Sequence, residues 1–99
     1  MANKPVQFHE EASTDIEAAF EWYFVRGEWA AARFLQAMDE GVRNIAESPA
    51  RWPLADSGTR KYLLGTFPFA LIYRELSSCV QIIAVAHTSR RPGFWTGRL

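Results

Sequence analysis

Residues 69–87 read FALIYRELSSCVQIIAVAH, and the architecture of the chain is organised around them. Two runs of β-branched and aromatic residues, Phe69–Glu75 and Val80–His87, are separated by the short break Leu76–Cys79. This composition around a short break is typical of an antiparallel β-hairpin. Both runs are apolar at successive positions, as in strands that are buried on both faces. The stretch therefore predicts two central, covered strands of a sheet.

Two further strands are predicted outside this hairpin. The first lies just before it, over Lys61–Gly65, with Thr66–Pro68 as the connecting turn and the loop Arg51–Gly58 upstream. The second is Val6–Glu10, near the start of the chain, where apolar and polar residues alternate. Since a lone strand must pair, we expect this segment to lie beside the last hairpin.

Between the first predicted strand and the loop Arg51–Gly58, apolar residues recur at helical spacing. Thr14–Glu17 has the sequence of a capping box, which predicts a helix over about Asp15–Val25. Gly27 interrupts the pattern, and a second helix is predicted over Glu28–Glu47, where Pro49 stops it. So short a turn predicts that the two helices form an antiparallel pair.

The order of elements is therefore strand, helix, helix, strand, strand, strand, β-α-α-β-β-β. This order predicts an α+β fold in which a helical hairpin packs on an antiparallel sheet. The 99 residues are expected to form a single domain, 1–99. A hydrophobic content of 48% with no net charge excludes intrinsic disorder.

Several observations point to a cytoplasmic protein. The one cysteine, Cys79, can form no intramolecular disulfide, as is usual in a reducing compartment. Residues 1–8 lack the apolar core of a signal peptide, and no apolar stretch approaches the roughly 20 residues that cross a bilayer. We therefore expect no membrane association.

The zero net charge conceals an asymmetry between the two halves of the chain. Residues 1–50 contain four basic and nine acidic residues, whereas residues 51–99 contain seven basic and two acidic ones. Such a division indicates a surface for an anionic partner in the second half. The alternative is that acidic helices and basic strands simply balance each other.

The usual signatures of catalytic and metal sites are absent from the sequence. The only soft metal ligands are Cys79, His9 and His87, and no pair of them has ligand spacing, so neither a metal nor a cofactor is expected. There is no glycine-rich phosphate loop and no Ser-His-Asp pattern. Cys79 is expected to be a small core residue rather than a nucleophile. A histidine side chain can serve as a general acid or base, but a lone histidine at a strand end, such as His87, is more often structural.

Basic and aromatic residues gather instead at the strand ends and in the tail. Arg60 and Lys61 begin one predicted strand, and the antiparallel order brings them near Arg74 at the end of the next. The last strand is followed by Arg90, Arg91, Phe94, Trp95 and Arg98. Guanidinium groups beside aromatic rings suit phosphates or acidic protein surfaces. The alternatives are that Arg74 pairs with its neighbour Glu75, and that Trp95 only packs the tail onto the sheet.

Three segments of the second half resemble the RelE/ParE superfamily of bacterial toxins: Phe67–Arg74 (FPFALIYR), Ile82–His87 (IIAVAH) and Arg90–Trp95 (RRPGFW). Ala12–Ile16 and Ile45–Pro49 also resemble family motifs at the start of the first helix and the end of the second. The resemblance covers nearly the whole chain and implies a helical hairpin on a sheet.

The resemblance further implies the toxin of a type II toxin–antitoxin pair. The expected partner is a small, largely acidic antitoxin that folds over the toxin and packs along the helical hairpin. Trp22 and Trp29 are the candidate antitoxin contacts, whereas Tyr23 and Phe34 are expected in the core. Four tryptophans are many for one small core, so at least one is expected to serve an interface.

The superfamily divides into ribosome-dependent mRNA endonucleases, which are RelE-like, and inhibitors of DNA gyrase, which are ParE-like. Positions that commonly carry the basic residues and tyrosine of the nucleases are here Leu63, Ala70, Thr88 and Phe94. The resemblance is therefore closer to the ParE-like members, which need no nuclease site, so enzymatic activity is not expected.

Candidate contacts to the target are the basic residues of the second half and one tryptophan: Arg60, Lys61, Arg74, Arg90, Arg91, Trp95 and Arg98. One alternative is an mRNA endonuclease with an altered site made of Lys61, His87, Arg90 and Arg91. The other is a non-toxic module that only binds the antitoxin.

Overall fold

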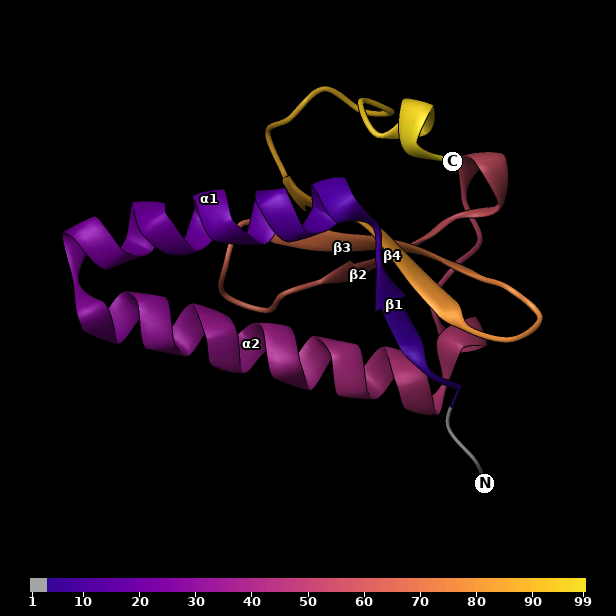
Figure 1. Ribbon diagram of the computed structural model, residues 1–99, viewed down its shortest axis with the longest axis horizontal. Helices are drawn as coiled ribbons and strands as arrows, with labels where there is room; N and C mark the ends of the chain where they lie inside the picture. Colours follow the sequence, from indigo (N-terminus) through magenta and orange to yellow (C-terminus); the bar gives the residue numbers. More distant parts are fainter. Residues whose placement is uncertain (1–3) are drawn as a thin grey trace.

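The computed structural model describes residues 4–99 as two helices packed on one face of a four-stranded sheet (Figure 1). The elements in chain order are β1 (Val6–Phe8), α1 (Glu10–Arg26), α2 (Glu28–Glu47), β2 (Arg60–Leu63), β3 (Phe69–Glu75) and β4 (Val80–His87). Short 3₁₀ turns lie at Pro49–Arg51 and Asp56–Gly58, between α2 and β2, and at Thr96–Arg98, after β4. The predicted α+β order is confirmed.

The strand order in the sheet is β1-β4-β3-β2, so that β3 and β4 are central as predicted. β2 pairs antiparallel with β3, and β3 with β4, but β1 pairs parallel with β4, from Val6 opposite Val80 to Phe8 opposite Ile82. The sheet is therefore mixed rather than fully antiparallel. Short turns fix the antiparallel direction only between neighbours in the chain, and β1 reaches β4 through the whole helical hairpin.

The start of α1 differs from the capping box predicted at Thr14. The helix begins at Glu10, where the Nδ1 atom of His9 accepts a hydrogen bond of 3.0 Å from the backbone N–H of Glu11. The hydroxyl of Thr14 donates back to the carbonyl of Glu10 inside the helix. Glu10 and Glu11 therefore lie in the first helical turn, where the dipole favours acidic residues, and β1 ends at Phe8.

The helical hairpin turns at Gly27 as predicted. The backbone N–H of Gly27 donates to the carbonyls of Tyr23 and Phe24, and α2 begins at the next residue. Further along, α2 passes very close to the sheet: a Cβ atom on Gly41 would lie 2.9 Å from the Tyr62 ring and 3.1 Å from Leu71. Glycine at this position therefore lets the helix approach the strands.

Both faces of the central strands are covered. The main core lies between the helices and the sheet and includes Phe34, Ile45, Leu71 and Ile82, all fully buried. On the other face, the tail residues Phe94 and Trp95 pack against a smaller cluster made of Ala70, Ile72 and Ala84. The prediction of two covered strands is confirmed, and the tail supplies the second cover.

Tyr73 gives the fold a pH-dependent element. Its ring is fully buried, its hydroxyl donates a 2.6 Å hydrogen bond to the carbonyl of Pro49, and burial raises the pKa of Tyr73 to about 12. Because the folded pKa lies above the unfolded value of about 10, this contribution to stability is complete below pH 10 and is lost as the pH rises toward 12.

We expect the free energy of unfolding to fall by up to about 2–3 kcal/mol across this pH range, and the change Tyr73→Phe to flatten much of that fall. Burial also raises the pKa of Tyr23, so a smaller slope of the same sign remains. The measurement is urea denaturation of both proteins between pH 8 and pH 12. A slope that Tyr73→Phe leaves unchanged would contradict this assignment.

Candidate functional site

Exposed cations surround a cavity of about 390 Å³ on the tail side of the sheet. Lys61 comes from β2, whereas Arg90 and Arg91 come from the segment after β4, and all three are exposed. We call this cavity the basic cleft. Its wall also includes His87 and the carboxylate-bearing residue Asp56. Among the described residues, the cations Lys61, Arg90 and Arg91 have no ion-pair partner, so their charge is available to an anionic group.

The β2–β3 register brings the predicted basic residues together. Arg60 lies opposite Tyr73 and Lys61 opposite Ile72, so both are close to Arg74, as expected. Their side chains have different roles, however. Nη1 of Arg60 donates to the carbonyl of Trp52 at 2.6 Å and to that of Ala50 at 3.3 Å, which ties down the loop before β2.

Arg74 and Glu75 have separate partners. Nε of Arg74 donates to the Gln81 side chain at 2.9 Å, and Glu75 forms an ion pair with Lys4, also at 2.9 Å. The structure therefore does not show the Arg74–Glu75 pair that was the alternative interpretation. Arg74 is half-buried and lies outside the lining of the basic cleft.

The tail is folded against the sheet by its aromatic residues. Trp95 is half-buried against the small cluster of Ala70, Ile72 and Ala84, in agreement with the packing role. The guanidinium of Arg90 lies 3.9 Å from the centre of the Phe94 ring, a cation–π contact. Both residues of this contact line the basic cleft.

Arg98 is held inside the molecule by Asp15 of α1, a residue that the sequence did not single out. Its Nη1 atom lies 2.7 Å from Oδ2 of Asp15, and the two side chains are only 10% and 12% exposed. The hydrogen bond to Asp15 raises the pKa of Arg98, so the residue remains charged. Of the predicted target contacts, Arg98 is the one most fully used within the chain.

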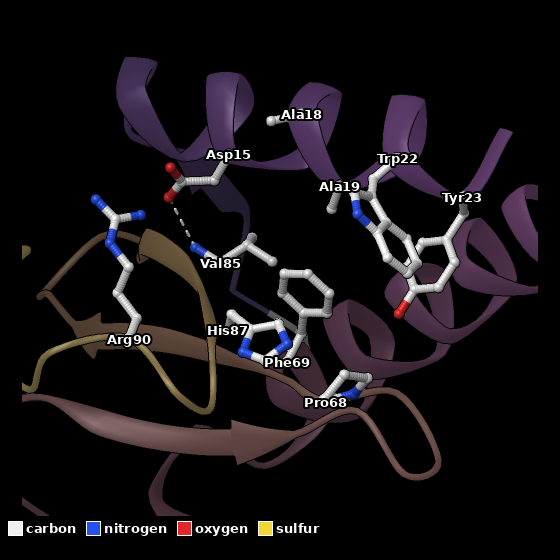
Figure 2. Close-up of a pocket in the computed structure, with 10 residues that line it drawn as sticks. All are labelled: Asp15, Ala18, Ala19, Trp22, Tyr23, Pro68, Phe69, Val85, His87 and Arg90. Carbon is white, nitrogen blue, oxygen red and sulfur yellow. Dashed lines mark hydrogen bonds between the residues drawn. The ribbon is translucent and has the colours of Figure 1, made fainter. Parts of the chain in front are cut away.

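A second cavity, of about 330 Å³, lies between α1 and the end of β4 (Figure 2). Its wall is mainly apolar, with Ala19, Trp22 and Tyr23 from the helix facing Phe69 and Val85 from the sheet. His87 and Arg90 belong to its polar side and also line the basic cleft. The two cavities are therefore neighbours that share these residues.

His87 lies between the two cavities, and its ring is partly engaged. Its Nδ1 atom accepts a 3.0 Å hydrogen bond from the backbone N–H of Ser89 and lies 2.7 Å from the Ser89 hydroxyl. The ring packs edge-on against Phe69, with centroids 5.1 Å apart. The four residues of the nuclease alternative, Lys61, His87, Arg90 and Arg91, all line the basic cleft.

Large apolar side chains are exposed at the turn of the helical hairpin. Trp29 is 82% exposed and Trp22 is 53% exposed, whereas Phe34 is buried and Tyr23 half-buried. Phe34 therefore lies in the core as expected, Tyr23 packs at the border of the core, and both tryptophans are accessible to a partner. Val25, 78% exposed, belongs to the same turn and was not singled out from the sequence. Arg26 stacks on Trp22 at 3.6 Å.

The described part of the chain shows neither a membrane-spanning helix nor a metal centre. Within residues 4–99, neither helix is long and apolar enough to cross a bilayer. In the same range, no three His, Cys, Asp or Glu residues are grouped so as to hold a metal ion. Cys79 is buried just before β4.

The chain is similar to known proteins in both sequence and fold. Residues 6–92 match the family model described as "ParE toxin of type II toxin-antitoxin system, parDE". A solved structure described as "Chromosomal ParDE TA system from P. aeruginosa" superposes with a TM-score of 0.76 at 20% sequence identity, over 85% of this chain and 95% of that chain. At this identity the superposition shows a common fold. No curated protein matches the sequence.

Proposed function

This chain belongs to the ParE toxin family of type II toxin–antitoxin systems, and from that premise we propose that it inhibits DNA gyrase and is neutralised by a cognate antitoxin. Both proposed partners are cytoplasmic, so the protein is proposed to act there. The observation that carries the gyrase assignment is the basic cleft, where Lys61, Arg90 and Arg91 are exposed and unpaired within residues 4–99. Unpaired cations around a concave surface attract an anionic partner and speed its association.

The proposed target surface contains all seven predicted residues, with different roles. Lys61, Arg90 and Arg91 contact the target directly around the basic cleft. Arg60, Arg74 and Trp95 support this surface from β2, β3 and the tail, since each is half-buried and engaged within the chain. Arg98 holds the tail in place.

The experiment that tests this proposal is a DNA supercoiling assay with purified gyrase and increasing amounts of the protein. We expect supercoiling to stop or cleaved DNA to accumulate, and addition of the cognate antitoxin to reverse the effect. A folded protein that leaves gyrase unaffected at saturating concentration would refute the proposed target. If expression without the antitoxin also proved harmless, the non-toxic binding module would become the better explanation.

A second candidate function is supported by one specific observation. Lys61, His87, Arg90 and Arg91 surround one cavity, as a nuclease site would need. However, Nδ1 of His87 is engaged by Ser89. Ala70 and Phe94, on the same side of the sheet, lack the charge and the hydroxyl of the RelE-like nucleases of the superfamily. If ribosome-bound mRNA were cleaved, His87→Ala would identify the proton carrier, since no other imidazole lines the cleft.

The antitoxin is proposed to bind the exposed turn of the helical hairpin through Trp22 and Trp29. We expect Trp29→Ala to weaken antitoxin binding by roughly tenfold or more, because exposed tryptophans are common hot spots of interfaces. The free energy of unfolding should hardly change, since the side chain is 82% exposed.

The measurement for Trp29→Ala is isothermal titration of the toxin variant with the cognate antitoxin. A matched control is Leu54→Ala, which removes a side chain that is 64% exposed in the loop before β2, away from the hairpin turn. Equal affinities for wild type and Trp29→Ala would remove this residue from the antitoxin surface.

A further inference from the structure

The edge of β4 is only partly covered by β1. The parallel ladder ends where Phe8 lies opposite Ile82, and the last backbone contact on this side is the bond from His9 N–H to the Ile82 carbonyl. Beyond this point the chain turns into α1, while β4 continues to His87. The backbone groups that follow on this edge need other partners, since buried polar groups left unpaired are costly.

Asp15 and Arg98 provide those partners. Oδ2 of Asp15 accepts a 3.0 Å hydrogen bond from the backbone N–H of Val85, which is drawn as a dashed line in Figure 2. Nη1 of Arg98 donates to the carbonyl of Ile83 at 3.1 Å. The two side chains also bind each other through both carboxylate oxygens, at 2.7 and 3.3 Å. One ion pair thus supplies the hydrogen-bond partners that a neighbouring strand would give to Ile83 and Val85, and it joins the tail to α1.

A series of contacts continues from Arg98 to the basic cleft. The guanidinium of Arg98 lies 5.3 Å from the centre of the Phe94 ring, and that of Arg90 lies 3.9 Å from the same centre. Phe94 also packs on the sheet with Trp95. The position of Arg90 is therefore connected, through Phe94 and Arg98, to a carboxylate on the first helix.

We propose that Asp15 is a positioning residue for target binding, which acts by clasping Arg98 and so holding Phe94 and Arg90 at the basic cleft. This inference rests on the proposed function, in which Arg90 contacts the target. Asp15 itself does not line the basic cleft, and within residues 4–99 its only ion-pair partner is Arg98 of the tail. The nearby Glu11 is 62% exposed and lies 3.9 Å from Nε of Arg98, so it contributes little.

We call the ion pair of Asp15 and Arg98 the clasp. Breaking it is expected to release the tail while the rest of the fold persists. In Arg98→Gln we expect backbone amides of residues 89–99 to exchange hydrogen at least about tenfold faster, with a smaller change at Leu71 and Ile82 in the core. The concentration for half-maximal gyrase inhibition should rise by roughly tenfold or more. Arg98→Lys, which keeps the charge but not the two-pronged geometry, should lie in between.

A double-mutant cycle distinguishes positioning through the pair from two separate effects. Asp15→Asn and Arg98→Gln should each weaken inhibition, and the double variant should be no weaker than the worse single one. The matched control is the ion pair of Lys4 and Glu75, which also joins distant parts of the chain at 2.9 Å. Lys4→Met should leave both tail exchange and inhibition unchanged.

The outcomes separate this inference from the proposed function. Tail amides that exchange at the wild-type rate in Arg98→Gln would overturn the clasp, as would fully additive losses in the cycle. If the tail is released but the wild-type protein never inhibits gyrase, the clasp stands as structure and the proposed target fails. Released tails with undiminished inhibition would show that Asp15 does not position the target surface.

Discussion

Reversing two tail charges, Arg90→Glu with Arg91→Glu, is expected to abolish gyrase inhibition, raising the half-maximal concentration by about 100-fold or more. Both side chains are exposed on the rim of the basic cleft and have no ion-pair partner among the described residues. The substitution therefore replaces attraction to an anionic target by repulsion. The contact of Arg90 with Phe94 is lost as well, which costs at most about 1 kcal/mol of stability at an exposed site.

The measurement is the supercoiling assay, with the thermal midpoint of unfolding as the test of folding. A matched control reverses two other exposed arginines, Arg33 and Arg43, which lie on α2. It makes the same change in net charge on a different element and should inhibit gyrase nearly as well as the wild type. Inhibition by the wild type and by the control should also weaken with rising salt, since exposed charges are screened. Inhibition by the tail variant at wild-type concentrations would exclude Arg90 and Arg91 from the target surface.

The fold was largely predictable because its signals are local. The hairpin Phe69–His87 and the two helices can each be predicted from the pattern of apolar residues within one segment. The direction of β1 and the start of α1 were not predictable in this way. The parallel pairing with β4 depends on the path of the whole chain, and the imidazole cap at His9 competes with a nearby capping-box sequence that looks stronger.

The candidate site shows the same division between local and distant effects. The sequence indicated Lys61, Arg90 and Arg91, and the strand register and the tail bring them around one cavity. It did not show that Arg60 serves the loop before β2, or that Arg98 binds a carboxylate 83 residues away. A basic residue in a tail looks the same in the sequence whether it is free or paired. Nothing in the sequence therefore indicated Asp15 as the partner of Arg98. Only the folded structure distinguishes the two cases.

Shortening the central aromatic residue, Phe34→Ala, is expected to lower the free energy of unfolding by about 3–5 kcal/mol. Phe34 is fully buried on α2, and its ring lies 5.4 Å from Tyr23, 5.8 Å from Phe67 and 5.7 Å from Phe69. Its removal leaves a cavity and ends three aromatic contacts at once. A domain of this size has only about 5–15 kcal/mol of stability, so the loss is a large share of the total.

Urea denaturation measures this effect, with Phe24→Ala as the control. Phe24 belongs to the same helical hairpin but is 48% exposed, so its truncation should cost less than about 1 kcal/mol. Loss of core packing affects every surface of the molecule together. Near its unfolding midpoint, Phe34→Ala should therefore lose antitoxin binding and gyrase inhibition in parallel, whereas the double reversal at Arg90 and Arg91 should lose only inhibition. A midpoint unchanged by Phe34→Ala would contradict the assignment of this ring to the core.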